Sequence, residues 1–220
     1  GRMADETGVS AYAVGGCVRD WLLGVGHLAD LDVTVEGPGI ALARLAAARL
    51  RGRMTAHEQV GTATVTLSGP GVRRVDMASC RKETYARPAA YPKVSPGTIE
   101  EDLFRRDFTI NAMALALNPG RLGLLVDPCH GAEDLRRKVL RILHHRSFLD
   151  DPSRILRGIR FARRFGLQWD PATATAARTA AGQGALGWLN AGRLRRELER
   201  ITEEPDPLAC LTALGALIGG

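Results

Sequence analysis

A pair of acidic residues inside an apolar run, Asp30-Leu31-Asp32, is the strongest constraint on the fold of this 220-residue chain. Side chains alternate between faces along an extended strand, so Asp30 and Asp32 point to one face while Leu31 and Val33 point into a core. Two neighbouring carboxylates repel each other unless a cation lies between them. Divalent metals about 3.5 to 4 Å apart hold the attacking and leaving oxygens of an in-line displacement. The pair therefore predicts a strand that serves two-metal phosphoryl chemistry, the alternative being a solvated strand edge.

A glycine turn precedes the acidic pair. Residues 11–14 are expected to form a short buried strand and residues 17–23 have helical apolar spacing, so Gly15-Gly16 falls at a strand-to-helix turn. Without a Cβ, the turn lets a phosphate approach the backbone N–H groups and the positive end of the helix dipole. Arg19, one turn into the helix, adds a fork of donors for the same anion. The turn, the arginine and the acidic strand together predict one connected site.

The length and charge of the chain place only wide limits on the class of protein. A chain of 220 residues suits one large or two small domains with a sizeable core. The 30 basic residues exceed the 24 acidic ones, and the net charge of +6 favours a polyanionic partner. The four cysteines are far apart, match no metal-binding spacing and are expected to be reduced thiols. No apolar stretch reaches the roughly 18 to 20 residues that span a bilayer, so we expect a soluble, cytoplasmic protein without membrane contact.

The first half of the chain has a mixed α/β pattern. Residues 39–50 are expected to form a helix, and residues 62–67 an alternating strand. A Ser-Gly-Pro-Gly turn then predicts a hairpin with a second strand over residues 72–78. That strand carries Asp76 between two apolar residues, which makes Asp76 a candidate third carboxylate of a two-metal site or an ordinary solvent-facing residue.

The segment over residues 81–96 has no periodicity. It combines basic residues, tyrosines and prolines, so we predict a mobile basic loop without secondary structure. Such a loop either closes over a substrate or forms an inert surface.

The second half of the chain becomes helical from residue 136 onward. Three breaks rich in glycine and proline divide it into at least four expected helices. We place a domain boundary near residue 145, with an α/β head over residues 1–145 and a helical neck over residues 146–220. The chain ends in an apolar helical segment, residues 217–220, and exposed apolar surface there would suggest a longer native protein.

A cluster of charged and polar residues lies between residues 101 and 112. Arg106 is a candidate ligand for triphosphate oxygens, while Asp107 and Asn111, one helical turn apart, are candidates for binding ribose hydroxyls. The alternative is a helix start with acidic N-terminal charge and surface salt bridges.

A second cluster begins at Asp150-Asp151-Pro152, where a proline after acidic residues predicts a helix N-terminus. At about 100° per residue, apolar side chains fill one face of this helix and arginines the opposite face. These arginines are Arg154, Arg157, Arg160 and Arg164. Such a row is most often a solvated face, which is the alternative to a role in ligand binding.

The start of this helix has an additional use. A carboxylate beside a guanidinium pairs with a base edge that offers an exocyclic amino group next to a ring-nitrogen acceptor. Cytosine and adenine have that edge, whereas uracil and guanine present a carbonyl next to an N–H. Asp151 and Arg154 are therefore expected to accept CTP and ATP and to reject UTP and GTP.

Taken in order, the motifs G-G-x-V-R-D, D-x-D, R-R-D-F-T-I-N-A and D-P-x-R-x-L-R-x-x-R-F-A resemble the class II tRNA nucleotidyltransferase and bacterial poly(A) polymerase family. The resemblance runs from about Tyr12 to about Leu217. It implies an α+β fold in which a polymerase β-like nucleotidyltransferase head, a mixed sheet with flanking helices, precedes an all-helical neck, the chain ending where a helical body begins. Family members are generally longer, and their template motif usually begins Glu-Asp, where this chain has Asp150-Asp151.

The resemblance also implies roles for individual residues. Asp30 and Asp32 would bind Mg²⁺, with Asp76 as a further catalytic carboxylate. Asp151 and Arg154 would serve as the protein template for the incoming base. The nucleotide-binding set would comprise Gly15, Gly16, Arg19, Arg106, Asp107, Asn111, Asp151, Arg154, Arg157 and Arg160.

The activity implied is addition of CMP and AMP from CTP and ATP to the 3′ end of tRNA, without a nucleic-acid template and with no obligate protein partner. The intact segment between Asp76 and Glu101 favours CCA addition over an enzyme that adds only CC. A-adding or poly(A) polymerase activity is the main alternative, because these enzymes share the head motifs. A catalytically silent RNA-binding module is the remote alternative, which the three carboxylates disfavour because a polyanion repels them.

Overall fold

The computed structural model describes residues 1–26 and 29–218. The described chain divides into two compact units, each built from separate stretches of sequence. The first unit comprises Gly1–Lys82, Val94–Arg106 and Asn111–Ala132, and the second comprises Glu83–Lys93, Asp107–Ile110 and Glu133–Gly220. None of the helices within the described ranges is long and apolar enough to cross a membrane.

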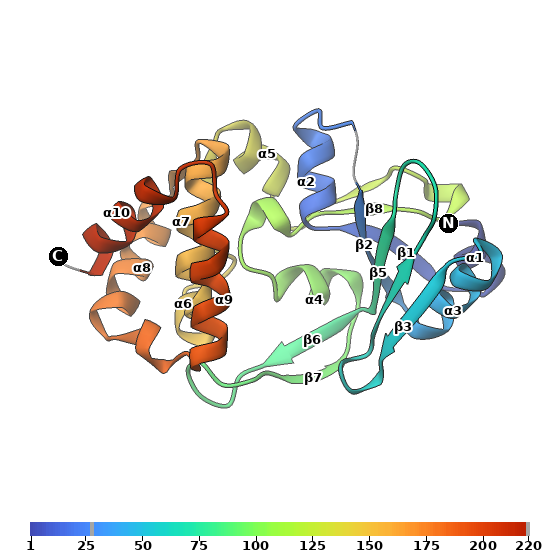
Figure 1. The fold of residues 1–220 in the computed structure, drawn as a ribbon, viewed down its shortest axis with the longest axis horizontal. Coiled ribbons are helices and arrows are strands. Elements are labelled where there is room, and N and C mark those ends of the chain that lie inside the picture. Colours follow the sequence, from blue (N-terminus) through green and yellow to red (C-terminus); the bar gives the residue numbers. More distant parts are fainter. Residues whose placement is uncertain (27–28, 219–220) are drawn as a thin grey trace. The chain divides into compact units, whose positions relative to one another are not determined.

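The first unit is built on a mixed sheet (Figure 1). Its strands are β1 (Ser10–Val14), β2 (Asp30–Glu36), β3 (Arg53–His57), β4 (Thr62–Thr66), β5 (Arg74–Ser79), β8 (Ala114–Ala116) and β9 (Leu125–Val126). The spatial order among the described strands is β3-β4-β5-β2-β1-β8-β9. The β2–β5 pair is parallel, and the other pairs are antiparallel. Flanking helices are α1 (Arg2–Glu6), α2 (Gly16–Leu22), α3 (Gly39–Arg49) and α4 (Ile99–Phe104). The mixed sheet with flanking helices confirms the predicted α+β class.

One face of this sheet packs against the alanine-rich helix α3. Leu42 and Ala46 of α3 share a buried core with Val33 and Val35 of β2 and with Val65 of β4. Full burial of each branched side chain contributes about 1.5 to 3 kcal/mol. Because strand side chains alternate, the same packing turns the even-numbered residues of β2 to the opposite face. The predicted alternation of apolar and acidic residues in this strand is confirmed.

The hairpin and helix predictions of the first half are close to the observed elements. The β4–β5 pair is antiparallel, as the turn signal predicted, and α3 ends at Arg49. The prediction of a loop without secondary structure over residues 81–96 is wrong at both ends. Residues Arg81–Thr84 form β6 and residues Lys93–Pro96 form β7, which pair as a two-stranded sheet. This ribbon is mostly polar and has no buried residue, so it has no apolar periodicity for sequence analysis to detect.

The second unit is mostly helical. Its helices are α6 (Ser147–Asp150), α7 (Ser153–Phe165), α8 (Pro171–Gly182), α9 (Ala191–Thr202) and α10 (Pro207–Ile218), and α5 (Gly131–Arg136) leads into it. The described part of this unit also contains a parallel pair, β10 (Val139–Leu140) and β11 (Gln168–Trp169), and a short 3₁₀ helix, η4 (Ala185–Trp188). Helices α7 and α9 lie side by side (Figure 1). The predicted breaks between helices are confirmed; of the apolar segment expected at residues 217–220, the last two residues lie outside the described chain.

An aromatic cluster forms the core of the second unit. The rings of Phe108 and Phe161 meet edge to face with centroids 6.0 Å apart, and Phe148 lies 6.3 Å from Phe108 and 6.1 Å from Trp169. Gly158 in α7 makes this packing feasible, because a Cβ there would lie 2.7 Å from the Trp169 ring and 2.9 Å from the Phe108 ring. The cluster thereby packs against the middle of α7, the helix whose start carries the second group of predicted site residues.

Candidate active site

The parallel pairing of β2 with β5 brings two predicted carboxylates into direct register. Asp32 lies opposite Asp76, and Asp30 lies opposite Arg74. Residues opposite each other on neighbouring strands point to the same face, which here is the face away from α3. Surrounding protein atoms displace water from Asp32 and, together with the Asp76 carboxylate, raise the pKa of Asp32 above its ordinary value of 3.8. This face of the sheet therefore concentrates negative charge at one point.

Asp76 is held in place by two neighbouring side chains. Thr64 of β4 lies opposite Asp76, and its Oγ1 donates a hydrogen bond of 2.6 Å to Oδ1 of Asp76. Arg74 donates from Nε to Oδ1 at 3.1 Å, and its Nη2 lies 2.9 Å from Oδ2. Because these contacts already set the direction of the Asp76 carboxylate, it loses less side-chain entropy when it binds a cation. Neither Thr64 nor Arg74 has a motif that marks it in the sequence.

The predicted glycine turn lies directly after β1. The backbone of Gly15 has φ of 72° and ψ of −128°, a conformation that residues with a side chain rarely adopt. A Cβ on Gly15 would also lie 2.7 Å from Nη1 of Arg106. Gly16, the first residue of α2, is less constrained, since its Cβ would meet only the Arg19 guanidinium at 3.5 Å. Gly15 thus lets the Arg106 side chain lie against the turn.

Arg106 and Arg19 are both anchored by buried polar side chains. Arg106 donates from Nη2 to Oδ2 of Asp102 at 3.0 Å, and its buried Nε has no hydrogen-bond partner among the described residues. Burial disfavours ionisation of Asp102, but the charges of Arg105 and Arg106 outweigh it and hold the pKa of Asp102 below its ordinary value. Arg19 donates from Nη1 to Oδ1 of Asn111 at 2.7 Å. The structure therefore brings Arg19 and Asn111 together within the first unit.

A cavity of about 350 Å³ opens on the carboxylate-bearing face of the sheet. Its lining includes Asp32, Thr64, Asp76, Arg105 and Arg106. A volume of this size falls within the range of ligand pockets. Acidic and basic side chains both line the cavity. A site for a polyphosphate with a bound metal needs both, because carboxylates bind the metal and guanidinium groups bind the phosphates.

The donor set suits Mg²⁺. This hard cation is usually held by one or two carboxylates, with water and substrate phosphates completing the octahedron, rather than by a cage of protein ligands. Across residues 1–26 and 29–218 no group of three or more His, Cys, Asp or Glu side chains forms such a cage. Asp30, Asp32 and Asp76 instead offer oxygen ligands on one open face. The residues present fit a magnesium site that is completed by the substrate.

In the second unit the predicted base-reading pair lies at the start of α7. Oδ1 of Asp151 accepts hydrogen bonds from Ser153 N at 3.1 Å, Ser153 Oγ at 2.6 Å and Arg193 Nη2 at 2.6 Å. Arg154 is 5% exposed and donates from Nη1 to Oγ of Ser147 at 2.7 Å. Both members of the pair are thus fixed by neighbours, and Arg193 is a contact that sequence analysis missed.

Asp107 and Arg157 form an ion pair. Arg157 donates to Oδ2 of Asp107 from Nε at 2.8 Å and from Nη2 at 2.5 Å, while Oδ1 of Asp107 accepts from Phe108 N at 2.8 Å. The Asp107 charge raises the pKa of Arg157 despite its burial. Two residues predicted to bind nucleotide therefore contact each other.

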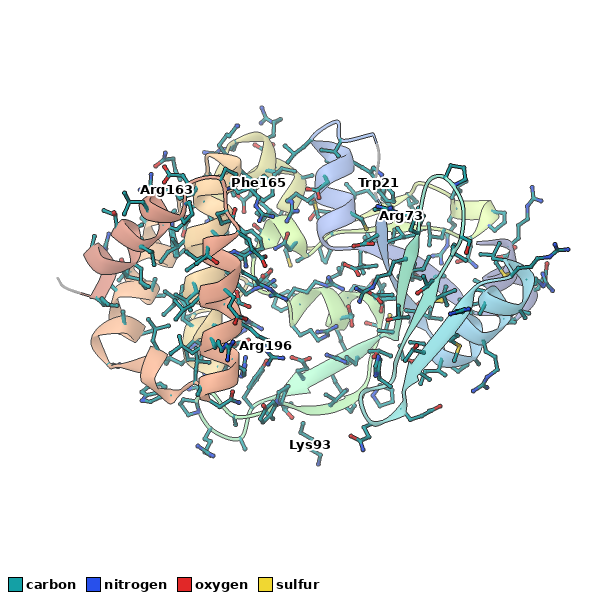
Figure 2. The ribbon with its side chains drawn as sticks, viewed as in Figure 1. Trp21, Arg73, Lys93, Arg163, Phe165 and Arg196 are labelled. Atoms are coloured by element: carbon teal, nitrogen blue, oxygen red, sulfur yellow. The ribbon has the colours of Figure 1, made fainter. Side chains whose placement is uncertain are left out.

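The alternative of a solvated arginine face on α7 does not hold for Arg154 and Arg160, which are buried. Arg160 donates from Nε to Oε1 of Glu204 at 2.8 Å and from Nη1 to Oε2 of Glu197 at 3.2 Å. Arg164 binds the same Glu204 at 2.6 Å. Acidic side chains of α9 and of the turn after it neutralise both guanidinium groups, which allows Arg160 to be buried, while Arg164 remains exposed. Figure 2 shows the side chains of this unit, with Arg196 on α9 and Phe165 at the end of α7.

Comparisons with known proteins agree with this geometry. A family model described as "Poly A polymerase head domain" matches residues 11–141. The A-adding tRNA nucleotidyltransferase of Halalkalibacterium halodurans is 41% identical over 216 residues, which is 97% of this chain and 50% of that protein. A solved structure described as CCA-adding enzyme apo form II has a TM-score of 0.92 and 42% identity over 98% of this chain and 50% of that one. The Thermotoga maritima CCA-adding enzyme complexed with tRNA has a TM-score of 0.85 and 40% identity over 99% of this chain and 48% of that one.

The mixed sheet, the strand-to-helix glycine turn and the paired carboxylates define a head domain of the nucleotidyltransferase type. The chain belongs to the poly A polymerase head domain family, whose model covers more than half of its length. It spans about half the length of the relatives and structures just described.

Proposed function

We propose that the protein is a tRNA nucleotidyltransferase that transfers CMP and AMP from CTP and ATP to the 3′ end of tRNA. The observation that carries this proposal is the register of β2 and β5, which sets Asp32 opposite Asp76 on the face that holds the cavity. Arg106 and Gly15 lie in the same unit, and Arg106 lies against the turn. These residues combine carboxylates for a metal with a guanidinium for a triphosphate.

The chemical step we propose is a direct in-line displacement. The 3′-hydroxyl of the RNA loses its proton to solvent and attacks the α-phosphorus of the nucleotide, the bond from that phosphorus to the bridging oxygen breaks, and pyrophosphate leaves. Bound Mg²⁺ would lower the pKa of the attacking hydroxyl and neutralise charge on the phosphates. Asp30 and Asp32 would hold the metal, Asp76 would act as the third carboxylate, and Arg106 and Arg19 would orient the triphosphate. No covalent enzyme intermediate is needed.

Base choice is assigned to the neck. In this proposal the head covers residues 1–145 and the neck residues 146–220, so Asp151 and Arg154 belong to the neck. Asp151 would accept from the exocyclic amino group of cytosine or adenine, and Arg154 would donate to the adjacent ring nitrogen. Asp107, Asn111, Arg157 and Arg160 would support the nucleotide site, Arg157 through its ion pair with Asp107. The cytoplasm, where tRNA ends are matured, is the proposed location.

The test uses the full native protein with Mg²⁺, labelled CTP or ATP, and tRNAs that end before C, after C and after CC. Growth to CCA followed by a stop supports CCA addition. Asp30→Ala and Asp32→Ala should abolish incorporation while circular dichroism shows folded protein. Retained turnover in either variant excludes two-metal catalysis by this pair.

A second candidate is A addition alone. The relative that supports it is the Halalkalibacterium halodurans protein, which is named A-adding and is 41% identical to this chain. The structure described as a CCA-adding enzyme has a similar identity, 42%, so identity does not separate the two activities. Extension only of tRNA that already ends in CC, or a long ladder of A, would assign the protein to A addition or poly(A) synthesis. Absence of any transfer, with RNA binding retained, would favour the silent RNA-binding module.

A further inference from the structure

The two oxygens of the Asp151 carboxylate differ in their hydrogen-bond partners. Oδ1 accepts from Ser153 N, Ser153 Oγ and Arg193 Nη2, at 3.1, 2.6 and 2.6 Å. Oδ2 has no hydrogen-bond partner among residues 1–26 and 29–218. A carboxylate whose one oxygen is saturated presents the other in a defined direction. Of the three donors, the two from Ser153 are local to the helix start, and only Arg193 comes from another element, α9.

Arg193 is itself held by the segment over residues 83–93, which belongs to the same unit. Its guanidinium carbon lies 6.0 Å from the centroid of the Tyr91 ring, within the range of a cation–π contact. Asn190 accepts from Arg193 N at 2.9 Å through Oδ1 and donates from Nδ2 to the Tyr91 hydroxyl at 2.9 Å. The N-cap of α9 thus connects Tyr91 and Arg193 in one network.

A second contact ties the same segment to the start of the neck helices. Ala89 N donates to the carbonyl oxygen of Leu149 in α6 at 3.0 Å. Tyr85 donates its hydroxyl to Oε2 of Glu83 at 3.0 Å, and its pKa is raised by burial and by Glu83, with Arg154 opposing and Asp151 adding to the rise. The segment therefore interacts electrostatically with Asp151 and Arg154 through Tyr85, and it contacts Arg193 through Tyr91.

We infer that Arg193 is the positioning residue for the base-reading carboxylate: it directs Oδ2 of Asp151 toward the incoming base, and Tyr91 sets the position of Arg193. The inference deepens the proposed function and rests on it. Arg193 touches no substrate in this scheme, since it acts through Asp151. Through Tyr91 and Arg193, base selection depends on how residues 83–93 are positioned, although those residues need not contact the base.

Removing Arg193 leaves Asp151 with only the Ser153 donors. The carboxylate then gains rotational freedom, and the bond from Oδ2 to the amino group of cytosine or adenine weakens. Loss of one charge-assisted hydrogen bond of this kind corresponds to roughly a 10- to 100-fold effect. The loss falls on CTP and ATP, which use the bond, and spares UTP and GTP, which do not. The expected signature is therefore a reduced selectivity ratio, which a general loss of folded protein does not produce.

The experiment measures dissociation constants of CTP, ATP, UTP and GTP, and single-turnover incorporation into tRNA ending in CC, with the full native protein. Arg193→Ala is expected to lower the ratio of ATP to GTP incorporation about 10- to 100-fold, and Arg193→Lys to restore part of it. Tyr91→Ala is expected to shift the ratio in the same direction, and Tyr91 is 75% exposed, so this change should leave the protein folded. Arg195→Ala is the matched control, because Arg195 lies on the same helix, is 81% exposed and pairs with Glu199.

The outcomes separate the inference from the proposed function. A wild-type protein that transfers no nucleotide, or that accepts all four equally, overturns the proposed function and the inference with it. A selective wild type whose ratio is unchanged in Arg193→Ala overturns the inference alone. A reduced ratio in Arg193→Ala and Tyr91→Ala, with wild-type behaviour of Arg195→Ala, supports it.

Discussion

Thr64 donates a hydrogen bond of 2.6 Å from Oγ1 to Oδ1 of Asp76, across the antiparallel pair of β4 and β5. Thr64→Val keeps the side-chain shape but removes this donor. We expect a fall of about tenfold in kcat and a higher Mg²⁺ concentration for half-maximal rate, because Asp76 is less well directed. Steady-state incorporation across a Mg²⁺ titration measures both. Thr66→Val, on the same strand and opposite Arg74, is the control; an equal loss in both variants would contradict the role of Thr64.

Gly15→Ala should affect both stability and nucleotide binding. The backbone conformation at φ of 72° and ψ of −128° becomes strained, which costs about 1 to 3 kcal/mol. The new Cβ also displaces Arg106, whose Nη1 would lie 2.7 Å away, so triphosphate affinity should fall. Gly61→Ala is the matched control, since Gly61 has φ of 66° and open space around it. Denaturant unfolding and ATP titration distinguish the two effects, and an unchanged ATP affinity in Gly15→Ala would exclude contact between Arg106 and the triphosphate.

Glu204→Gln should destabilise the second unit. Glu204 is 5% exposed and binds both Arg160 and Arg164, so the change leaves the buried Arg160 without a full counter-charge. Removing one partner of a buried ion pair costs roughly 3 to 5 kcal/mol. Glu199→Gln, which breaks an exposed pair with Arg195, should cost less than about 1 kcal/mol. Urea unfolding of both variants tests the difference; equal midpoints would show that the buried network adds nothing to stability.

His144 should make stability depend on pH. Burial, and to a smaller extent the nearby positive charge of Arg154, lower the pKa of His144 below its ordinary value of 6.5. The unfolded chain therefore binds a proton at a higher pH than the folded protein does. This contribution to the free energy of unfolding is fully present above pH 6.5 and is lost as pH falls from there through the folded pKa. His144→Gln should flatten the dependence in that window; equal slopes for variant and wild type would remove His144 as the cause.

The sheet and the acidic pair were predictable from sequence because their signals are local. Alternation in β2 fixed which face Asp32 occupies, and the turn after β4 fixed the hairpin that carries Asp76. The β6–β7 ribbon was not predictable, since exposed polar strands lack an apolar period.

The partners of the predicted site residues were beyond sequence analysis for a different reason. Arg193 lies 42 positions from Asp151, and Glu204 lies 44 positions from Arg160. No local sequence pattern predicts which acidic side chain pairs with which arginine across two packed helices. The helical period located the arginine face of α7 correctly, but burial of Arg160 depended on acidic side chains that only the packing of α9 against α7 supplies.

The parallel register of β2 and β5 also determines where the chain can tolerate the insertion or deletion of residues. The turn between β4 and β5 is exposed around Gly69, so added residues there would extend a surface loop without altering either strand. A single residue gained or lost within β5 has a different effect, because a shift of one position exchanges the two faces of a strand. Asp76 would turn toward the alanine-rich helix α3, and Val75 or Met77 would take its place beside Asp32. Insertions and deletions in homologous chains should therefore collect in this turn and be absent from the strand that follows it.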